Sequence, residues 1–290
     1  MKIGNVIFKS KRYLAVSTSG DNVDLFDDAA FYDSGKTKCA TTDTLLNHPE
    51  LLDKIISGEI KATINSVNEP FTTFLPCVLS PGKIICVGLN YSSHAKESNA
   101  SLPDKPVLFS KFTDSLSGHN NEIKIPKEAH NVDYEAELGV VIGRKAFKVE
   151  RSEALDYIFG YFPANDVSAR DLQFIGGQWL LGKTLPGFAP IGPYITTSDG
   201  VRNPNTLDIS LTLNDELRQS SNTRNMIFPV DYLIKYISNY LPLNPGDIIL
   251  TGTPEGVIYG LPEEERIWLK HGDITEVSIE KLGSLKSKFI

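Results

Sequence analysis

The feature that most constrains this chain is the segment from 131 to 143, NVDYEAELGVVIG, in which two glutamates stand at the start of an apolar run. Alternate side chains of a strand point to the same face, so Glu135 and Glu137 share one face. The opposite face carries a continuous apolar row, made of Tyr134, Ala136, Leu138, Val140 and Ile142. The segment therefore predicts a core strand with two like charges side by side.

Two neighbouring carboxylates repel each other, and a divalent cation would offset this repulsion because hard cations bind carboxylate oxygens. A third acid, Asp166, follows a predicted helix and a second extended segment, within PANDVSARDLQ. An all-oxygen set of this kind favours Mg²⁺, with Mn²⁺ or Ca²⁺ as alternatives. The competing interpretation is that the three acids are solvated surface charges, the usual state of an isolated Glu-x-Glu.

The composition argues against a nucleic-acid-binding protein and against a membrane protein. The formal net charge of -7 gives no basic surface for binding nucleic acid. No apolar run is long enough to cross a membrane, and the first residues lack the apolar core of a signal peptide. Cys39, Cys77 and Cys86 have no CxxC spacing, which favours a reducing compartment. We therefore expect a cytoplasmic protein that binds neither nucleic acid nor membrane.

Hydrophobic patterning predicts an α+β, β-rich chain in two domains, a small α+β domain at 1–78 and a larger domain at 79–290 that contains the candidate site residues. Paired strands near 6–8 and 13–16 and a helix over 44–56 are expected in the first. In the second we expect a helix that begins at Pro229 and strands at 84–87, 207–213, 248–250 and, as the last, 274–279.

A histidine and a glutamate come after the strand at 84–87. His94 and Glu97 are three residues apart, so on a helix they are neighbours. Such a pair can act as a general base, because the carboxylate holds the imidazole tautomer and stabilises its charged form. The alternative is a surface pair without function. The polar residues after it predict a lid over about 91–104.

The stretch from 177 to 184, GQWLLGKT, fits the phosphate-loop pattern G-x-x-x-x-G-K-[ST]. That loop must be followed by a helix, but LPGFAPIGP follows here, with three prolines and two glycines. An ATPase is therefore disfavoured. Lys183 remains of interest as a buried cation facing a substrate with a carboxylate.

The segments GLNYSSHAKE, DYEAELGVVIG, NDVSARDLQF, LGKTLPGFAPIGP and GDIILTGTPEGV occur in this order. Together they resemble the fumarylacetoacetate hydrolase family over residues 80–285. The resemblance implies a mixed β-sandwich roll, usually paired as a homodimer. Larger members carry a further metal-binding Asp before the histidine, and here Asn90 and Tyr91 occupy that region. The chain therefore looks like a smaller, bacterial-type member.

The resemblance also implies roles for individual residues. The metal ligands would be Glu135, Glu137 and Asp166. The catalytic residues would be His94, Glu97 and Lys183. His94 and Glu97 would act on water, and Lys183 would stabilise an oxyanion. The side chains that bind the substrate would be Arg170, Gln173 and Thr253.

This set predicts a metal-dependent hydrolase that cleaves a C–C bond in a 2,4-dioxo acid of the acylpyruvate or fumarylacetoacetate type. The same site would also suit decarboxylation or tautomerisation of oxaloacetate, or hydroxymuconate-type isomerisation or decarboxylation. A non-catalytic relative that binds 2-oxo acids is the alternative from another class. The complete set of acidic and basic residues argues against it.

Overall fold

The computed structural model describes residues 1–18, 22–34, 39–68, 73–97 and 101–290. Within these residues the larger sheet has eleven strands in the order β4-β3-β2-β1-β15-β12-β11-β18-β6-β7, and β5 pairs with β1. Its strands are β1 Lys2–Phe8, β2 Lys11–Ser17, β3 Asn22–Phe26, β4 Ile64–Asn68, β5 Thr73–Phe74, β6 Ile84–Gly88, β7 Val107–Lys111, β11 Ala136–Ile142, β12 Ile158–Asn165, β15 Tyr194–Thr197 and β18 Ile248–Leu250.

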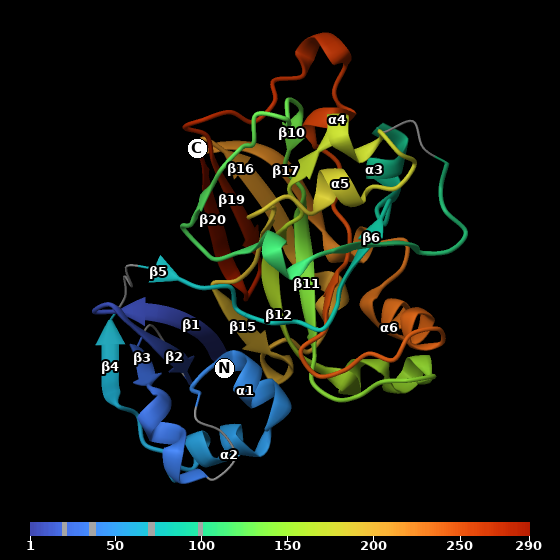
Figure 1. Cartoon of the computed structure of the whole chain (residues 1–290). Helices are drawn as coiled ribbons and strands as arrows, with labels where there is room; N and C mark the ends of the chain where they lie inside the picture. The colour runs from blue at the N-terminus through green and yellow to red at the C-terminus, as the bar shows by residue number, and fades with distance from the viewer. Residues whose placement is uncertain (19–21, 35–38, 69–72, 98–100) are drawn as a thin grey trace.

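A second sheet of five strands packs against the middle of the first, as Figure 1 shows for β16, β17, β19 and β20 beside β11 and β12. Its strands are β9 Glu122–Ile123, β16 Asp208–Leu213, β17 Glu216–Asn222, β19 Ile274–Ile279 and β20 Gly283–Phe289. The core between the sheets is formed by buried apolar side chains, including Leu138, Val140, Leu211 and Val277. The predicted β-rich α+β sandwich is therefore confirmed.

The remaining elements lie at the two ends of this sandwich. Figure 1 shows α3 to α5 together at one end and α6 at the other. The helices are α1 Thr42–Asn47, α2 Glu50–Ile56, α3 Ser92–Glu97, α4 Arg170–Gln173, α5 Leu180–Lys183 and α6 Val230–Ser238, with a 3₁₀ helix η3 at Arg151–Tyr157. Two short ladders pair β10 Val132–Asp133 with β13 Ser168–Ala169, and β8 Leu116–Ser117 with β14 Ala189–Pro190.

Several sequence predictions were wrong in detail. The single helix expected over 44–56 is split into α1 and α2, because the residue before Pro49 avoids the helical backbone region. The strand at 274–279 is not the last one, since β20 follows it. The strand expected over 131–143 is interrupted at 134–135, between β10 and β11, and the helix expected before Asp166 is the 3₁₀ helix η3. The expected α6 after Pro229 and the half-buried alternation of β16 are present.

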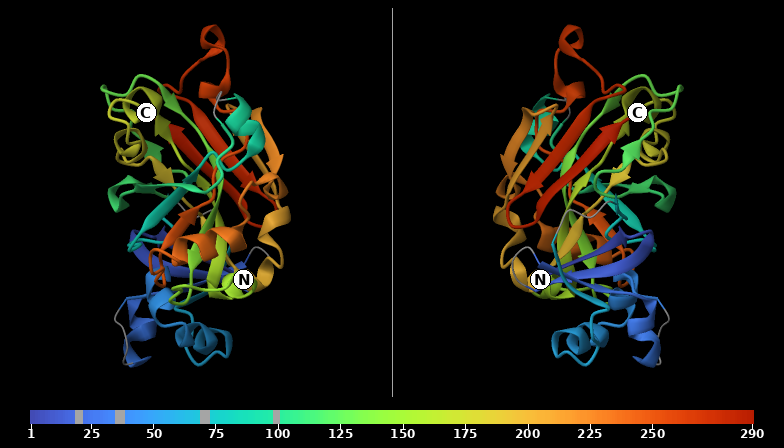
Figure 2. Two further views of the ribbon diagram at one scale, coloured as in Figure 1. Left: turned by 90° about the vertical axis from the view of Figure 1, so that its right-hand side faces the viewer. Right: turned by 90° about the vertical axis from the view of Figure 1, so that its left-hand side faces the viewer.

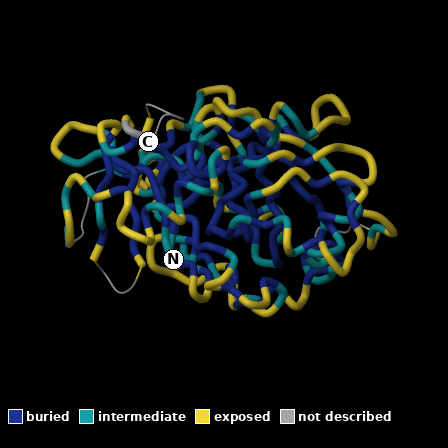
Figure 3. The backbone as a smooth tube through the Cα atoms, turned by 90° about the horizontal axis from the view of Figure 1, so that it is seen from below, coloured by how far each residue is buried: buried dark blue, intermediate teal, exposed yellow. Residues whose placement is uncertain are grey.

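The N-terminal part continues the larger sheet. Strand β1 pairs antiparallel with β15, with Lys2 opposite Thr196 and Gly4 opposite Tyr194. Gly4 permits this close approach, because a Cβ atom there would lie 2.7 Å from the Tyr194 ring. Figure 2 shows this blue part at one end of the molecule, and Figure 3 shows buried backbone running through the interior. The boundary at 78/79 stays a prediction.

No helix in the described ranges is both long enough and apolar enough to cross a membrane.

Candidate active site

Strand pairing brings the three predicted metal ligands together. Glu137 lies in β11, Glu135 immediately precedes it, and Asp166 immediately follows β12. In the antiparallel register Ala136 is opposite Asn165, and the Asp166 N–H donates to the Glu135 carbonyl at 2.9 Å. One carboxylate oxygen from each acid lies within 4.8 Å of the others, and all three residues are buried. The cluster is therefore no solvated surface patch.

The environment of Glu137 tests whether the cluster fits a divalent ion. Its Oε2 accepts a hydrogen bond of 2.8 Å from the Gly252 N–H, in the turn after β18. In the described part of the chain no Lys, Arg or His forms an ion pair with it. Burial, followed by the negative charges of Asp166 and Glu135, raises the pKa of Glu137 well above its ordinary value. A divalent cation would compensate this charge, so the residues fit such an ion.

Two buried lysines contact the other two acids. Lys183 Nζ donates to Glu135 Oε2 at 2.7 Å and to Asp166 Oδ2 at 2.9 Å. Lys111, at the end of β7, donates to Asp166 Oδ1 and to the Val167 carbonyl. Burial alone would raise the pKa of Glu135, but the charges of Lys183 and Arg170 outweigh it and lower the pKa to about 2. Glu135 is therefore held as a carboxylate.

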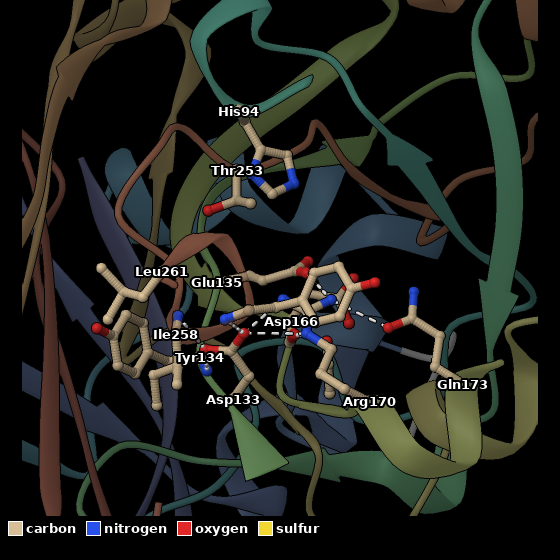
Figure 4. A network of polar contacts seen from close by, with 12 residues as sticks. His94, Asp133, Tyr134, Glu135, Asp166, Arg170, Gln173, Thr253, Ile258 and Leu261 are labelled. Carbon is tan, nitrogen blue, oxygen red and sulfur yellow. Dashed lines mark hydrogen bonds and ion pairs between the residues drawn. The ribbon is translucent and has the colours of Figure 1, made fainter. Parts of the chain in front are cut away.

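Arg170 begins α4 and has all its donor atoms engaged. Its Nε and Nη2 donate to Asp133 Oδ2 at 3.0 and 2.8 Å, and its Nη1 contacts Glu135 Oε1 at 2.7 Å. Nη1 also donates to Gln173 Oε1 at 3.0 Å, which leaves the Gln173 amide nitrogen as a donor (Figure 4). The substrate-binding roles predicted for both residues stay predictions. The arrangement favours Gln173 over Arg170 for such a contact.

Tight packing between α4 and α5 brings Lys183 to the cluster. A Cβ atom on Gly182 would lie 2.4 Å from the Ala169 carbonyl oxygen and 2.5 Å from the Gln173 nitrogen. The glycine of the apparent phosphate loop is therefore needed for helix packing. Residues 185–197, which directly follow Thr184, form no helix, so the helix that a phosphate loop needs at this point is missing.

The predicted His–Glu pair is present in α3. His94 Nδ1 lies 2.8 Å from Glu97 Oε1, and Glu97 Oε2 accepts a hydrogen bond of 2.9 Å from the Gly256 N–H. Because a carboxylate accepts, Nδ1 carries the proton, so Nε2 is the ring atom that can take up a proton in the neutral imidazole. The predicted lid over 91–104 includes residues 98–100, which lie outside the described residues.

These side chains line one cavity of about 160 Å³. It brings together the predicted residues Glu135, Glu137, His94, Arg170, Gln173, Lys183 and Thr253. The remaining wall is mostly apolar and aromatic, formed by Val87, Gly88, Leu89, Phe109, Phe174, Trp179 and Tyr259. Asp166 lies beneath, bound to Lys183. A volume below the roughly 300–1,000 Å³ of drug-sized ligand sites suits a small acid.

A buried glutamine fixes the position of Thr253. Gln219 Nε2 donates to Thr253 Oγ1 at 2.9 Å, while Gln219 Oε1 accepts from the Ala136 N–H at 2.9 Å. One side chain on β17 thus ties the turn at 251–256 to the start of β11. This contact holds Thr253 in the lining of the cavity.

Sequence reasoning missed Lys111, Asp133, Gln219 and Tyr259. A single lysine at the end of an apolar run resembles a surface residue, because lysines are mostly exposed. Asp133 offered a weak signal, since it stands two residues before Glu135 within the apolar segment. Nothing in the sequence places Gln219 or Tyr259 near the carboxylates, because both come from distant parts of the chain.

Residues 83–290 match the family described as fumarylacetoacetate (FAA) hydrolase C-terminal. The chain is 45% identical to the mitochondrial oxaloacetate tautomerase Fahd2a of Rattus norvegicus over 219 residues, which are 75% of this chain and 69% of that protein.

Two solved structures are similar to this protein over the whole length of its chain. The fumarylacetoacetate hydrolase of Exiguobacterium antarcticum is 30% identical with a TM-score of 0.83, covering 100% of this chain and 99% of that chain. Maleylpyruvate hydrolase from Sphingobium sp. SYK-6, solved with manganese(II) and pyruvate, is 27% identical with a TM-score of 0.79 and the same coverage. Because the family match spans residues 83–290, this chain belongs to the fumarylacetoacetate hydrolase family.

Proposed function

We propose that this protein is a divalent-metal-dependent enzyme that interconverts the keto and enol forms of oxaloacetate. The observation that carries the proposal is the buried Glu135–Glu137–Asp166 cluster, whose two glutamates line one small cavity together with His94, the partner of Glu97. A relative at 45% identity is named an oxaloacetate tautomerase, which favours this reaction among those open to the family.

The charges of the site support an anionic substrate. Within the described part of the chain, the site gathers four buried carboxylates and three buried cations, namely Asp133, Glu135, Glu137 and Asp166 with Lys111, Arg170 and Lys183. When all are ionised, one negative charge is in excess. A divalent ion would reverse this to one positive charge, and uncompensated buried charge is costly. This positive charge would offset one carboxylate of an anionic substrate.

The chain's own residues supply proton transfer and orientation. His94 Nε2 can take a proton from C3 of the substrate and return it to the oxygen on C2, while Glu97 stabilises the imidazolium formed between the two steps. The Gln173 amide nitrogen and the Lys183 ammonium are donors for the substrate's oxygens. A bound Mg²⁺ or Mn²⁺ would supply the charge that holds the 2-oxo acid group and favours loss of the C3 proton.

Hydrolysis of a 2,4-dioxo acid is the second candidate. The His94–Glu97 pair favours it, because the same base can take a proton from water for attack on the C4 carbonyl. The similar maleylpyruvate hydrolase, which was solved with pyruvate, supports this candidate. Decarboxylation of oxaloacetate needs no activated water and is the third reaction to measure.

The test is a panel of 2-oxo acids assayed with purified protein, with and without Mg²⁺ or Mn²⁺. The loss of the oxaloacetate enol is followed by ultraviolet absorbance, and pyruvate and released acids are identified as products. We expect metal-dependent acceleration of keto–enol exchange without net loss of oxaloacetate. Faster cleavage of acylpyruvates than exchange would favour the hydrolase. Binding of oxalate without turnover of any substrate would identify a non-catalytic relative.

Mg²⁺ as the physiological ion, a homodimer and a cytoplasmic location belong to this proposal as well. The ion follows from the all-oxygen ligand set and the dimer from the family resemblance. The rat relative is named as mitochondrial, so the compartment must be settled by imaging or fractionation of cells.

A further inference from the structure

A buried aspartate outside the predicted site receives an unusual number of hydrogen bonds. Asp133 is 0% exposed and lies in β10, two residues before Glu135. Its Oδ1 accepts from the N–H groups of Tyr134 at 2.8 Å and Ile258 at 2.9 Å. Its Oδ2 accepts from the Tyr259 N–H at 3.0 Å and twice from Arg170. Five donors therefore converge on one carboxylate.

The two hydrogen bonds to Arg170 fix the plane of its guanidinium. With Nε and Nη2 both bound to Asp133, only Nη1 is directed toward the cavity side, where it contacts Glu135 and Gln173. Figure 4 shows Asp133, Arg170 and Gln173 joined in this order by dashed lines. A guanidinium held on two sides keeps one orientation, because its donors form a rigid fork.

The same carboxylate anchors a second wall of the cavity. Through the Ile258 and Tyr259 N–H groups, Asp133 binds the turn that carries the Tyr259 ring. Two arginines contact that ring, with the Arg170 guanidinium 5.6 Å and the Arg266 guanidinium 4.9 Å from its centre. Asp133 thus links α4 to the chain segment around 258.

We propose that Asp133 is a positioning residue of the active site, which acts through Arg170. It holds the guanidinium so that Nη1 fixes Glu135 in the carboxylate cluster and turns the Gln173 amide nitrogen toward the substrate. Metal ligands depend on such supporting contacts, whose loss typically costs about 10- to 100-fold in metal affinity or activity. The inference rests on the metal site of the proposed function.

The test is Asp133→Asn, which keeps the shape but leaves one acceptor oxygen where five donors meet. Mn²⁺ affinity of the full-length protein is measured by electron paramagnetic resonance or calorimetry, together with the melting temperature. We expect a loss of roughly tenfold or more in affinity. The exposed Asp215→Asn is the matched control and should bind like the wild type.

A double-mutant cycle separates positioning from a general effect on the fold. If Asp133 acts through Arg170, then Asp133→Asn/Arg170→Met should bind Mn²⁺ no more weakly than Arg170→Met alone. An additive loss in the double variant would overturn the inference. Wild-type affinity in Asp133→Asn would overturn this inference alone, whereas absence of Mn²⁺ binding by the wild-type protein would overturn it together with the proposed function.

Arg170→Lys keeps the test valid if Asp133→Asn does not fold. A lysine retains the positive charge beside Glu135 but cannot donate twice to Asp133 while reaching Glu135 with a third N–H. We expect weakened Mn²⁺ binding in this variant too. Wild-type affinity would show that the fixed guanidinium is unimportant and would overturn the inference.

Discussion

Single carboxylates in the cluster have unequal surroundings. Glu135 and Asp166 face Lys183, Arg170 and Lys111, whereas Glu137 faces a backbone N–H. Because burial costs a charged group most when no opposite charge is near, Glu137 carries the largest electrostatic cost without metal. The same residue should therefore contribute most to ion binding and least to the stability of the metal-free chain.

Glu137→Gln separates these two effects. The glutamine amide oxygen can still accept a hydrogen bond from the Gly252 N–H, while the substitution removes the uncompensated negative charge. We expect the unfolding free energy of the metal-free protein to rise by roughly 1 kcal/mol or more. Mn²⁺ affinity should fall by about 100-fold or more, since a ligand is lost. Chemical denaturation and metal titration measure the two effects, with the exposed Glu263→Gln as control. A destabilised metal-free variant would contradict this account.

The variant His94→Ala tests whether His94 is the general base of the proposed reaction. The rates of keto–enol exchange and of acylpyruvate hydrolysis should each fall by roughly 10²-fold or more, since both need proton transfer by His94. Oxaloacetate decarboxylation should lose less, because it needs mainly the metal site. All three rates are compared at saturating Mg²⁺, with the exposed His271→Ala as control. Equal losses in all three reactions would give His94 a role common to them, and an unchanged exchange rate would remove it from the proposed chemistry.

Individual elements show how far local sequence determines this fold. Strand β16 was predictable because Ile209, Leu211 and Leu213 alternate with polar residues. Strand β20 was not, because a buried Ser287 interrupts its apolar row between Leu285 and Phe289. The two-residue spacing of Glu135 and Glu137 was enough to predict that their side chains lie close together. The contacts of Lys111 and Asp133 could not be predicted, since their partners come from distant parts of the chain.

Asp27 between β3 and η1 (Asp28–Ser34) provides a pH-dependent prediction. It accepts from Lys11, from Thr63 Oγ1 at 2.9 Å and from the Ala30 N–H at 3.2 Å. The hydrogen bond from Lys11, ahead of the others, lowers the pKa of Asp27. A carboxyl with a lowered folded-state pKa adds stability above its unfolded value of about 3.9, and this contribution is lost as pH falls through the folded value.

Asp27→Asn should therefore lower the melting temperature at pH 7. The difference from the wild type should shrink as the pH falls below about 3.9, where the wild-type carboxyl takes up its proton. Thermal unfolding at a series of pH values measures this, with the exposed Asp104→Asn as control. A difference that is constant from pH 7 to pH 2 would contradict the argument.

The whole molecule is joined by one sheet that spans both predicted domains. Deleting residues 1–78 would leave one side of β15 without its partner β1 and would uncover Ile195 and Phe159, which pack against N-terminal residues or beside them. Exposed strand edges promote aggregation. We expect a fragment of residues 79–290 to form aggregates in size-exclusion chromatography, where the full chain runs as a defined species. A monodisperse, stable fragment would support an independent domain.

The predicted homodimer belongs to the same scale. Sedimentation equilibrium at micromolar concentration should give twice the chain mass of 32.0 kDa. A species with the mass of one chain would refute the dimer without affecting the metal site.

The place of β18 in the sheet bears on how the protein is made. Strand β18 lies between β11 and β6, pairing antiparallel with the first and parallel with the second. Until Ile248–Leu250 has left the ribosome, the segment that carries His94 and Lys111 has no strand that joins it to Glu137. At a synthesis rate of about 5–20 residues per second, the segment with His94 and Lys111 and the strand with Glu137 stay unconnected for several seconds. A nascent chain stalled before residue 248 should therefore be a substrate for chaperones and unable to retain Mn²⁺.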